Sequence, residues 1–340
     1  MSRKWLPRST PPVQALQNLA YSVLLSHPTG EEAVRRGLAA VIHGGREMPV
    51  FDQQSPIGFI GAGAVGGTLA VALGQAGYCV VAIASRTWAS AHGLAQRLVG
   101  CTAYASPQQV VEACELIFIS TPDDAIGQVA SGLTWRAGQG VVHCSGATSL
   151  DVFAVPVAQG VLPGALHPFQ AVASLDAGVP SLPGTTFGIE ADGAMREVLV
   201  AMARALGGRP IVLTAADKAL YHVSAVMMGN LLTGLAATAA QLWEHLGASR
   251  VDGLQAVVAM MHSVVHNLER AGLPAAVAGP YVRGDVGTIR RHFETLSATA
   301  PTVLPLYREL ALAALPFAVE KGALSYEQSQ AIRHLIAQYR

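Results

Sequence analysis

The sequence predicts an α/β domain with a parallel sheet, followed by an all-α domain. From Ser55 onwards, short apolar segments alternate with helical segments, and the first of them, PIGFIG, runs directly into a glycine-rich turn. Alternation of this kind is typical of parallel sheets, whose crossovers are right-handed. After Thr214 the pattern becomes helical and continues so to the end of the chain.

The composition indicates a folded protein with a neutral surface. The chain has 340 residues, of which 51% are hydrophobic and only 13% are charged, and 22 basic residues balance 22 acidic ones. A disordered chain would be richer in charge, and a nucleic-acid binder would need a basic field that is missing here. So few charges indicate that part of the surface is covered by another subunit.

The cysteines indicate a reducing compartment. The four cysteines are widely spaced, with no CxxC pair. We therefore expect buried free thiols in a cytoplasmic protein, and no metal site.

Shifts in composition divide the chain into four parts. We expect a poorly ordered N-terminal extension at 1–50, a nucleotide-binding domain at 55–190, a connecting helix and strand at 191–213, and a helical domain at 214–340. A run of 25 residues, 219–243, has no charged side chain and is long enough to cross a bilayer. Because the run also holds His, Asn, Gln and Thr, we expect a buried helix of the helical domain, and no membrane.

The glycine turn predicts a dinucleotide site. Gly61, Gly63 and Gly66 form a GxGxxG motif between a strand and a helix. The first glycine permits a tight turn, the second lets the backbone approach a pyrophosphate, and the third lets the helix pack closely on the strand. The helix N-terminus offers free N–H groups to the phosphates. The expected binding residues are Gly61, Ala62, Gly63, Ala64, Val65 and Gly66.

The end of the second strand predicts which cofactor binds. An NAD site has an acid there to hold the ribose hydroxyls, but this chain has Ser85, Arg86 and Thr87. Two hydroxyls and a guanidinium suit a 2′-phosphate. We therefore expect NADP(H).

The ends of later strands supply further candidates. In open α/β sheets, ligands bind outside the carboxyl ends of the strands. Thr121 and Pro122 follow the fourth strand, and Ser145 follows the fifth, so we expect these three to contact the cofactor. His143 and His167 are candidates for substrate binding. The alternative, that each is a histidine packed at a strand end, stays open.

The helical half contains two polar motifs. Lys218 and His222 lie four residues apart near the start of an uncharged helix, so they share a face. A desolvated lysine can donate a proton to a carbonyl oxygen during hydride transfer. The alternatives are a lysine paired with Asp217 or exposed, and a packed histidine. In the loop GPYVRGDVG, Arg283 could bind a substrate carboxylate or pair with Asp285.

Six segments together resemble one family: GFIGAGAVG, TPDDAI, VHCSGA, LHPFQ, DKALYHVSAVMMGN and GPYVRGDVGTIRRH. It is a bacterial Rossmann-like family whose C-terminal half is a domain of unknown function. It is related in plan to ketopantoate reductase, pyrroline-5-carboxylate reductase and the β-hydroxyacid dehydrogenases. The resemblance implies a Rossmann domain, a helical domain similar to that of 6-phosphogluconate dehydrogenase, and a homodimer built through the helices.

One departure from these relatives concerns the catalytic residues. The relatives place an asparagine about one turn after the catalytic lysine, where this chain has His222. Asn230 lies twelve residues after Lys218, roughly 18 Å along a helix, so it could assist only if the helix broke, for instance at Gly229. We therefore expect catalysis by Lys218 and His222, with Asn230 lining the substrate pocket.

These observations predict an NADPH-dependent reductase acting on a carbonyl or imine carbon. We expect a small substrate that carries a carboxylate, such as a ketopantoate-like molecule, bound by His143, His167, Asn230, Arg283 and Asp285. Two alternatives remain: a regulatory protein that binds NADP(H) without catalysis, and a deazaflavin:NADP oxidoreductase.

Overall fold

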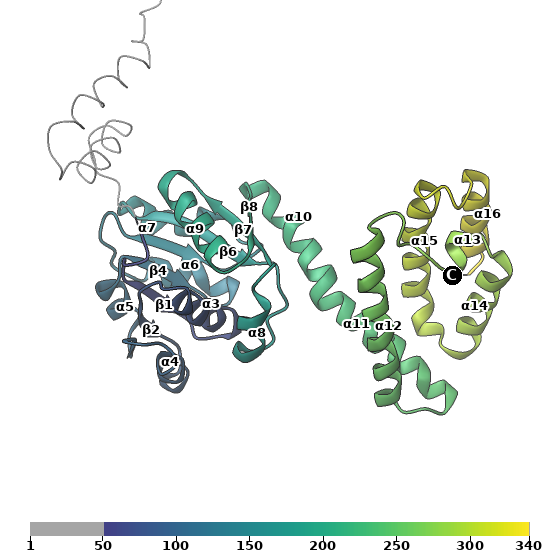
Figure 1. The fold of residues 1–340 in the computed structure, drawn as a ribbon, viewed down its shortest axis with the longest axis horizontal. Helices are drawn as coiled ribbons and strands as arrows, with labels where there is room; N and C mark the ends of the chain where they lie inside the picture. The colour runs from purple at the N-terminus through teal and green to yellow at the C-terminus, as the bar shows by residue number, and fades with distance from the viewer. Residues whose placement is uncertain (1–50, 340) are drawn as a thin grey trace, which may run out of the picture. The chain divides into compact units, whose positions relative to one another are not determined.

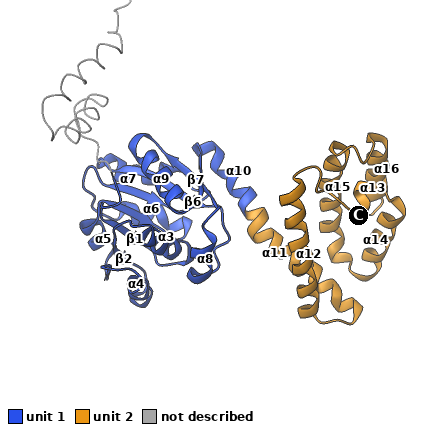
Figure 2. Cartoon of the chain, in the orientation of Figure 1, with its two compact units in different colours: residues 1–225 blue, residues 226–340 orange. Residues whose placement is uncertain are grey.

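A computed structural model describes residues 51–339, so the expectation for 1–50 lies outside the described part of the chain. The chain divides into two compact units, Met1–Ala225 and Val226–Arg340 (Figure 2). The first is built around a sheet and the second is helical (Figure 1). This confirms the predicted fold class.

The first unit contains an eight-stranded sheet in the order β3-β2-β1-β4-β5-β6-β7-β8. The strands are β1 (Ile57–Ile60), β2 (Val80–Ala84), β3 (Thr102–Tyr104), β4 (Leu116–Ile119), β5 (Gly140–His143), β6 (Leu162–Pro168), β7 (Thr186–Ala191) and β8 (Arg209–Val212). Every neighbouring pair is parallel except β6 and β7, which are antiparallel. The connection between these two contains one short helix, α8 (Leu175–Ser181), which packs on α3 rather than crossing the sheet, so β7 returns in the opposite direction.

Helices cover both faces of this sheet. They are α3 (Ala64–Gln75), α4 (Trp88–Ala95), α5 (Pro107–Ala113), α6 (Asp123–Ser131), η1 (Leu150–Phe153), α7 (Ala154–Ala158), α8 and α9 (Gly193–Ala205). On one face, Leu69 of α3 and Leu199 of α9 belong to the cluster that buries Phe59 and Phe118. On the other, Val110 of α5 joins the cluster around the remaining side chains of β4. Burial on both faces explains the unbroken apolar runs of β1 and β4.

Residues 191–213, which we expected to connect two domains, extend the sheet. They form α9 and β8, and β8 pairs with β7 in parallel. Met195 and Met202 of α9 are buried in the same cluster as the central strands. In this structure the segment is therefore part of the α/β unit.

The chain leaves the sheet through α10 (Ala215–Val226), whose first eleven residues belong to the first unit. The second unit contains η2 (Met227–Leu231), α11 (Leu232–Gln241), η3 (Leu242–Leu246), α12 (Arg250–Ala271), α13 (Pro280–Arg283), α14 (Val286–Thr299), η4 (Pro301–Val303), α15 (Leu304–Glu320) and α16 (Tyr326–Ala337). Phe293, Leu315 and Ile332 lie at the centre of its core. Ser325 and Gln328 form a capping box at the start of α16.

The uncharged run at 219–243 is not buried within a single chain. The helical stretch Ala215–Leu246 contains an 18-residue apolar window of which only 6% is buried. The expectation of a core helix is therefore wrong for the chain alone. Among residues 51–339, this stretch and Pro301–Glu320 are long and apolar enough to cross a membrane, which is weak evidence by length and composition only.

Candidate active site

The glycine turn has the backbone that a dinucleotide site requires. Gly61 has φ +113°, a left-handed conformation that favours glycine. A Cβ on Gly66 would lie 2.0 Å from Ser120 Oγ, so this glycine permits close packing of α3 against the end of β4. A Cβ on Gly63 would meet nothing within 4 Å, which leaves that side of the turn open to a ligand. The backbone conformation and free space at these glycines are compatible with a dinucleotide site.

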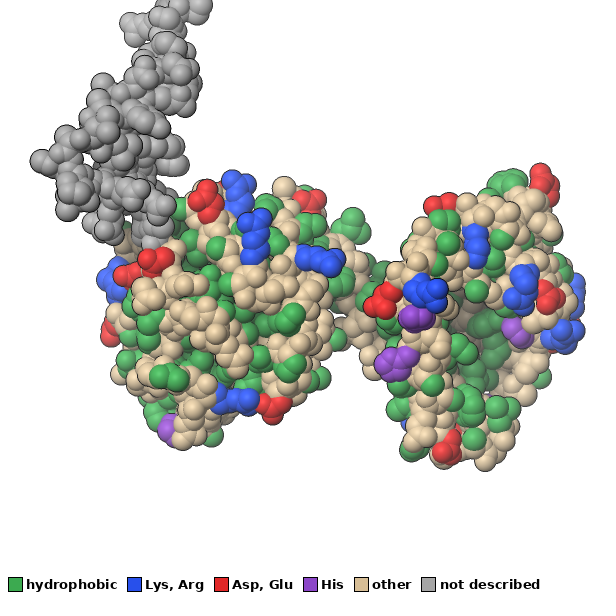
Figure 3. Space-filling view, viewed as in Figure 1, with side chains coloured by type: hydrophobic (Ala, Val, Ile, Leu, Met, Phe, Trp, Pro, Cys, Tyr) green, Lys and Arg blue, Asp and Glu red, His purple; other side chains and the backbone are tan. Residues whose placement is uncertain are grey.

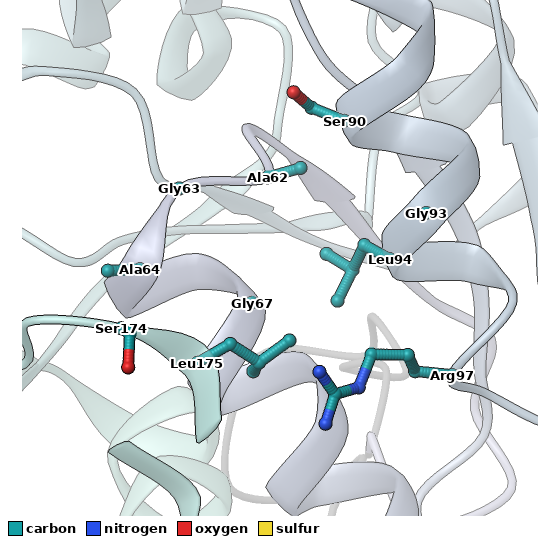
Figure 4. Close-up of a pocket in the computed structure, with 10 residues that line it drawn as sticks. All are labelled: Ala62, Gly63, Ala64, Gly67, Ser90, Gly93, Leu94, Arg97, Ser174 and Leu175. Atoms are coloured by element: carbon teal, nitrogen blue, oxygen red, sulfur yellow. The ribbon is translucent and has the colours of Figure 1, made fainter. Parts of the chain in front are cut away.

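A cavity of about 400 Å³ opens beside this turn. Figure 4 shows the side chains around it. Its lining residues are Ala62, Gly63, Ala64, Gly67, Ser90, Gly93, Leu94, Arg97, Ser174 and Leu175. Arg97, from beyond the end of α4, forms an ion pair of 2.7 Å with Asp176 of α8. The sequence predicts the glycine turn but not the cavity walls that α4 and α8 form. The packing of α8 against α3 is a long-range contact for which the sequence contains no local signal.

The end of β2 presents polar groups to solvent. Ser85 is half-buried, while Arg86 and Thr87 are exposed. Thr87 Oγ1 lies 2.6 Å from Ser90 Oγ, and no side-chain hydrogen bond caps the first turn of α4. The structure therefore leaves the guanidinium and hydroxyls accessible to an anionic ligand, without an acid at 85–87 to repel it.

The register of the sheet aligns the strand ends that carry the candidate residues. One row of paired residues crosses the sheet: Ala84, Ile60, Ile119, His143, Ala165 and Glu190. Gly61 of the glycine turn follows Ile60 directly, and Thr121 and Ser145 lie two residues after Ile119 and His143. Glu190 reaches the same row from β7 because that strand is antiparallel to β6.

Polar side chains after β4 and β5 form the next part of the site. Ser145 is buried; its hydroxyl lies 2.7 Å from Asp123 Oδ2 and accepts from Thr148 N at 3.0 Å. Pro122 is the N-cap residue of α6. The Thr121 hydroxyl is buried without a hydrogen-bond partner, so it is available to a bound molecule.

His143 is enclosed in the core. It is fully buried, and its ring packs against Phe153 with centroids 5.4 Å apart. Its Nδ1 accepts from Ser145 N at 3.2 Å. Burial, together with the charges of Lys218 and His167, lowers the pKa of His143 to about 3, so the ring is neutral at ordinary pH. This geometry favours the packed-histidine interpretation.

Lys218 is buried and paired with an acid that is distant from it in the sequence. The residue is only 2% exposed, and its Nζ lies 3.2 Å from Glu190 Oε2. Asp217, the partner suggested by the sequence, instead accepts from Thr214 N and Oγ1. Burial lowers the pKa of Lys218, while Glu190, Asp123 and Cys144 oppose that change. The signal available in the sequence was a single carboxylate within an apolar strand, TFGIEA.

Two histidines and a tyrosine lie next to this pair. The His167 and His222 rings are 5.7 Å apart and nearly perpendicular, and Tyr221 Oη lies 3.0 Å from His167 Nδ1. Burial and the charges of His222 and Lys218 lower the pKa of His167 to about 4. His222 Nδ1 is buried without a partner, next to the backbone of Gly146, where an added Cβ would lie 2.6 Å away. The structure thus brings Lys218, His222 and His167 together.

The remaining candidates belong to the second unit. Asn230 lies in the π-helical turn η2 and is exposed, and the helix continues through Gly229 without a break. Arg283 is exposed at the end of α13. Asp285 is the N-cap residue of α14, and its Oδ1 accepts from Thr288 N at 3.0 Å. This carboxylate therefore has a structural role at the start of the helix.

Comparison with known proteins agrees with this fold. A Rossmann-like domain model matches residues 47–168, and a model described as a domain of unknown function (DUF2520) matches residues 185–314. A candidate NADP oxidoreductase from Bacteroides fragilis is 25% identical, with a TM-score of 0.65 over 78% of this chain and 99% of that one. None of the curated proteins matches.

More distant structures share the fold alone. A pyrroline-5-carboxylate reductase from Coxiella burnetii is 14% identical, with a TM-score of 0.52 over 79% of this chain and 97% of that one. A reductive aminase from Aspergillus terreus, solved with NADPH and ethyl levulinate, is 18% identical, with a TM-score of 0.52 over 84% and 100%. The resemblance stated from the sequence is confirmed: the chain joins a Rossmann-like domain to a DUF2520 domain.

Proposed function

We propose that this protein is an NADP(H)-dependent reductase that transfers a hydride to the carbonyl carbon of a small carboxylate-bearing substrate. The main observation that supports this proposal is the row of paired residues that runs across the sheet from Ala84 to Glu190. It aligns the open glycine turn with the strand end at His143 and with Glu190, the partner of Lys218. The glycine turn and the buried Lys218 ammonium therefore lie along one edge of the sheet, which supports a bound nucleotide and a proton donor at the same site. The similarity to a candidate NADP oxidoreductase supports the same conclusion.

The residues present fit the cofactor. The open side of Gly63 admits a pyrophosphate, and the unpartnered hydroxyl of Thr121 is free to donate to the nicotinamide half. Arg86, with Ser85 and Thr87, would hold the 2′-phosphate of NADP(H). When bound, the reduced cofactor supplies the hydride.

Lys218 supplies the proton in this proposal. As the hydride reaches the carbonyl carbon, the carbonyl oxygen takes a proton from the Lys218 ammonium, which leaves an alcohol and a neutral amine. An ammonium stabilises the negative charge that develops on a carbonyl oxygen but repels an iminium cation. A carbonyl substrate is therefore favoured over an imine. His222, on the next turn of α10, would orient the substrate.

The second unit contributes the remaining parts of the proposal. Arg283 is the candidate for binding the substrate carboxylate, since it is exposed and bidentate binding suits a guanidinium. Apolar side chains are exposed along α12, among them Val251, Leu254, Val258 and Val265. Figure 3 shows hydrophobic side chains at the surface of this unit. We propose that a second copy of the chain covers them in a cytoplasmic homodimer.

Two variants test the reductase. Arg86→Ala should weaken NADPH binding about tenfold or more while leaving NADH binding unchanged, because only NADPH carries the 2′-phosphate. Lys218→Ala should retain NADPH binding and lose at least a hundredfold in kcat against a panel of 2-oxo acids and cyclic imines. Wild-type turnover by Lys218→Ala would refute the role of Lys218.

Two other outcomes identify the alternatives. If NADPH raises the Tm but no substrate in the panel is turned over, the protein is a regulatory binder. If NADPH reduces an added deazaflavin but no oxo acid, the protein is a deazaflavin:NADP oxidoreductase. Size-exclusion chromatography with light scattering tests the homodimer, and a monomer at micromolar concentration would contradict it.

A further inference from the structure

Glu190 is a buried acid in a strand whose other buried residues are apolar. Five of the six residues of β7 are buried, and Glu190 itself is 9% exposed. A carboxylate in such a place is strongly destabilising unless a positive group compensates it. The Lys218 ammonium, 3.2 Å away, is that group.

The same contact determines where the lysine side chain lies. Lys218 begins near the solvent-exposed start of α10, and its neighbours Asp217 and Ala219 are both exposed. Its side chain nevertheless turns inward, and Nζ lies next to the Glu190 carboxylate. Glu190 pairs with Ala165 of β6, and Ala165 pairs with His143, the last residue of β5. The Glu190 carboxylate therefore holds the ammonium close to the carboxyl ends of β4 and β5.

Several other titratable groups face Lys218 from the elements around it. They are Asp123 of α6, His143 and Cys144 at the end of β5, and His167 of β6, with His222 of α10 beside the His167 ring. Burial keeps the Cys144 thiol protonated, with a pKa of about 12, and the His143 and His167 rings are neutral above pH 5. Asp123 is exposed, and its Oδ2 accepts from Ser145. Glu190 is therefore the carboxylate in direct contact with the ammonium.

We propose that Glu190 is the positioning residue of the reductase site: its carboxylate holds the Lys218 ammonium at the strand ends and keeps it charged when cofactor and substrate exclude water. The inference rests on the proposed function, because a charged lysine matters only if it donates a proton. Without Glu190, burial would favour the neutral amine, and a neutral amine cannot act as the acid.

The chain allows a direct measurement, because it contains only three lysines, Lys4, Lys218 and Lys321. The full-length protein is labelled with ¹³C-lysine, the Lys218 signal is assigned with Lys218→Arg, and its titration is followed by NMR. In Glu190→Gln, the Lys218 midpoint should move at least one pH unit lower than in the wild type. Glu197→Gln, which removes an exposed carboxylate from α9, is the matched control and should leave the midpoint unchanged.

Kinetics supply a second readout that a merely structural ion pair would not change. The alkaline limb of the kcat–pH profile should shift to lower pH in Glu190→Gln by the same amount as the Lys218 midpoint, with the KM for NADPH unchanged. The double variant Glu190→Gln/Lys218→Gln should be no slower than Lys218→Gln alone, since Glu190 acts through the lysine. A double variant at least tenfold slower would overturn the proposal.

A third variant allows the test to be made even if Glu190→Gln fails to fold. If Glu190→Gln does not fold, Glu190→Asp keeps the charge but withdraws it by one methylene, so the Lys218 midpoint should fall by a smaller amount. An unchanged midpoint in the variant that folds overturns the role of Glu190, whatever the activity. If Glu190→Gln shows the expected midpoint shift but the wild type turns over no substrate, the proposed function alone is overturned.

Discussion

Tyr221 and His167 are joined by two hydrogen-bond contacts. The Tyr221 hydroxyl lies 3.0 Å from His167 Nδ1, and it donates to the His167 carbonyl oxygen at 3.2 Å. The two residues are 54 positions apart, one on β6 and the other on α10. This contact fastens the first turns of α10 to the sheet and so fixes the helix face that carries Lys218.

Removing the Tyr221 hydroxyl tests this attachment. Tyr221→Phe should lower the free energy of unfolding by about 1–2 kcal/mol, because the contacts to His167 are lost within a half-buried region. Chemical denaturation followed by circular dichroism measures this change. Tyr326→Phe removes an exposed hydroxyl from α16 and serves as the control, with no change expected. Equal effects of the two substitutions would contradict the attachment.

Substitutions at two glycines of the turn should affect NADPH binding and protein stability separately. In Gly63→Ala the new methyl group meets nothing in the protein, so stability should be unchanged while NADPH affinity falls at least tenfold, because the methyl group occupies the approach of the pyrophosphate. In Gly66→Ala the methyl group collides with Ser120, so the Tm itself should fall by several degrees. Calorimetric melting and NADPH titration distinguish the two, and a destabilised Gly63→Ala would contradict this interpretation.

The two buried histidines predict acid sensitivity. Below pH 6.5 the histidines of the unfolded chain take up protons, whereas His167 and His143 in the folded chain do so only near pH 4 and pH 3. The unfolded state therefore binds more protons between about pH 4 and 6.5, and stability is lost as the pH falls through that window.

Urea unfolding at pH 7.5 and pH 5.0 measures this loss. It should be smaller in His143→Gln, which lacks one of the two groups. It should be unchanged in His92→Gln, since His92 is exposed on α4. The same loss in all three proteins would show that the buried His143 ring does not contribute to it.

Arg136 closes the end of α5. Its guanidinium donates to the carbonyl oxygens of Val111, Glu112 and Cys114 at 3.0–3.2 Å. Arg136→Met keeps the apolar stem of the side chain and removes these hydrogen bonds. The free energy of unfolding should therefore fall by about 1–2 kcal/mol. Arg196→Met, from an exposed position on α9, is the control. If both variants unfold at the same denaturant concentration as the wild type, the capping role is wrong.

Much of the fold follows from local sequence signals. The apolar runs of β1, β2, β4 and β5 are long enough to be buried on both faces, and the glycine motif lies between strand and helix where the structure has it. The helical pattern predicted after Thr214 corresponds to the helices from α10 to α16. The antiparallel direction of β7 was not predicted, because it depends on α8 packing against α3 instead of crossing the sheet.

For the candidate site, the sequence predicted single residues but not the contacts between them. Lys218 and His222 could be singled out because a lysine and a histidine four apart at the start of an uncharged helix are unusual. Glu190 and Tyr221 could not, since their roles depend on partners 28 and 54 positions away.

The chain's own order of residues determined the nucleotide-binding turn, the strand–helix alternation and the helical second half, since these depend on backbone conformation and on the spacing of apolar side chains over a few residues. Only the tertiary structure decided which acid faces Lys218, which histidine is enclosed and which walls complete the cavity. These outcomes require strands and helices that are distant in the chain to pack together, and the energy of such contacts is not encoded in any one segment.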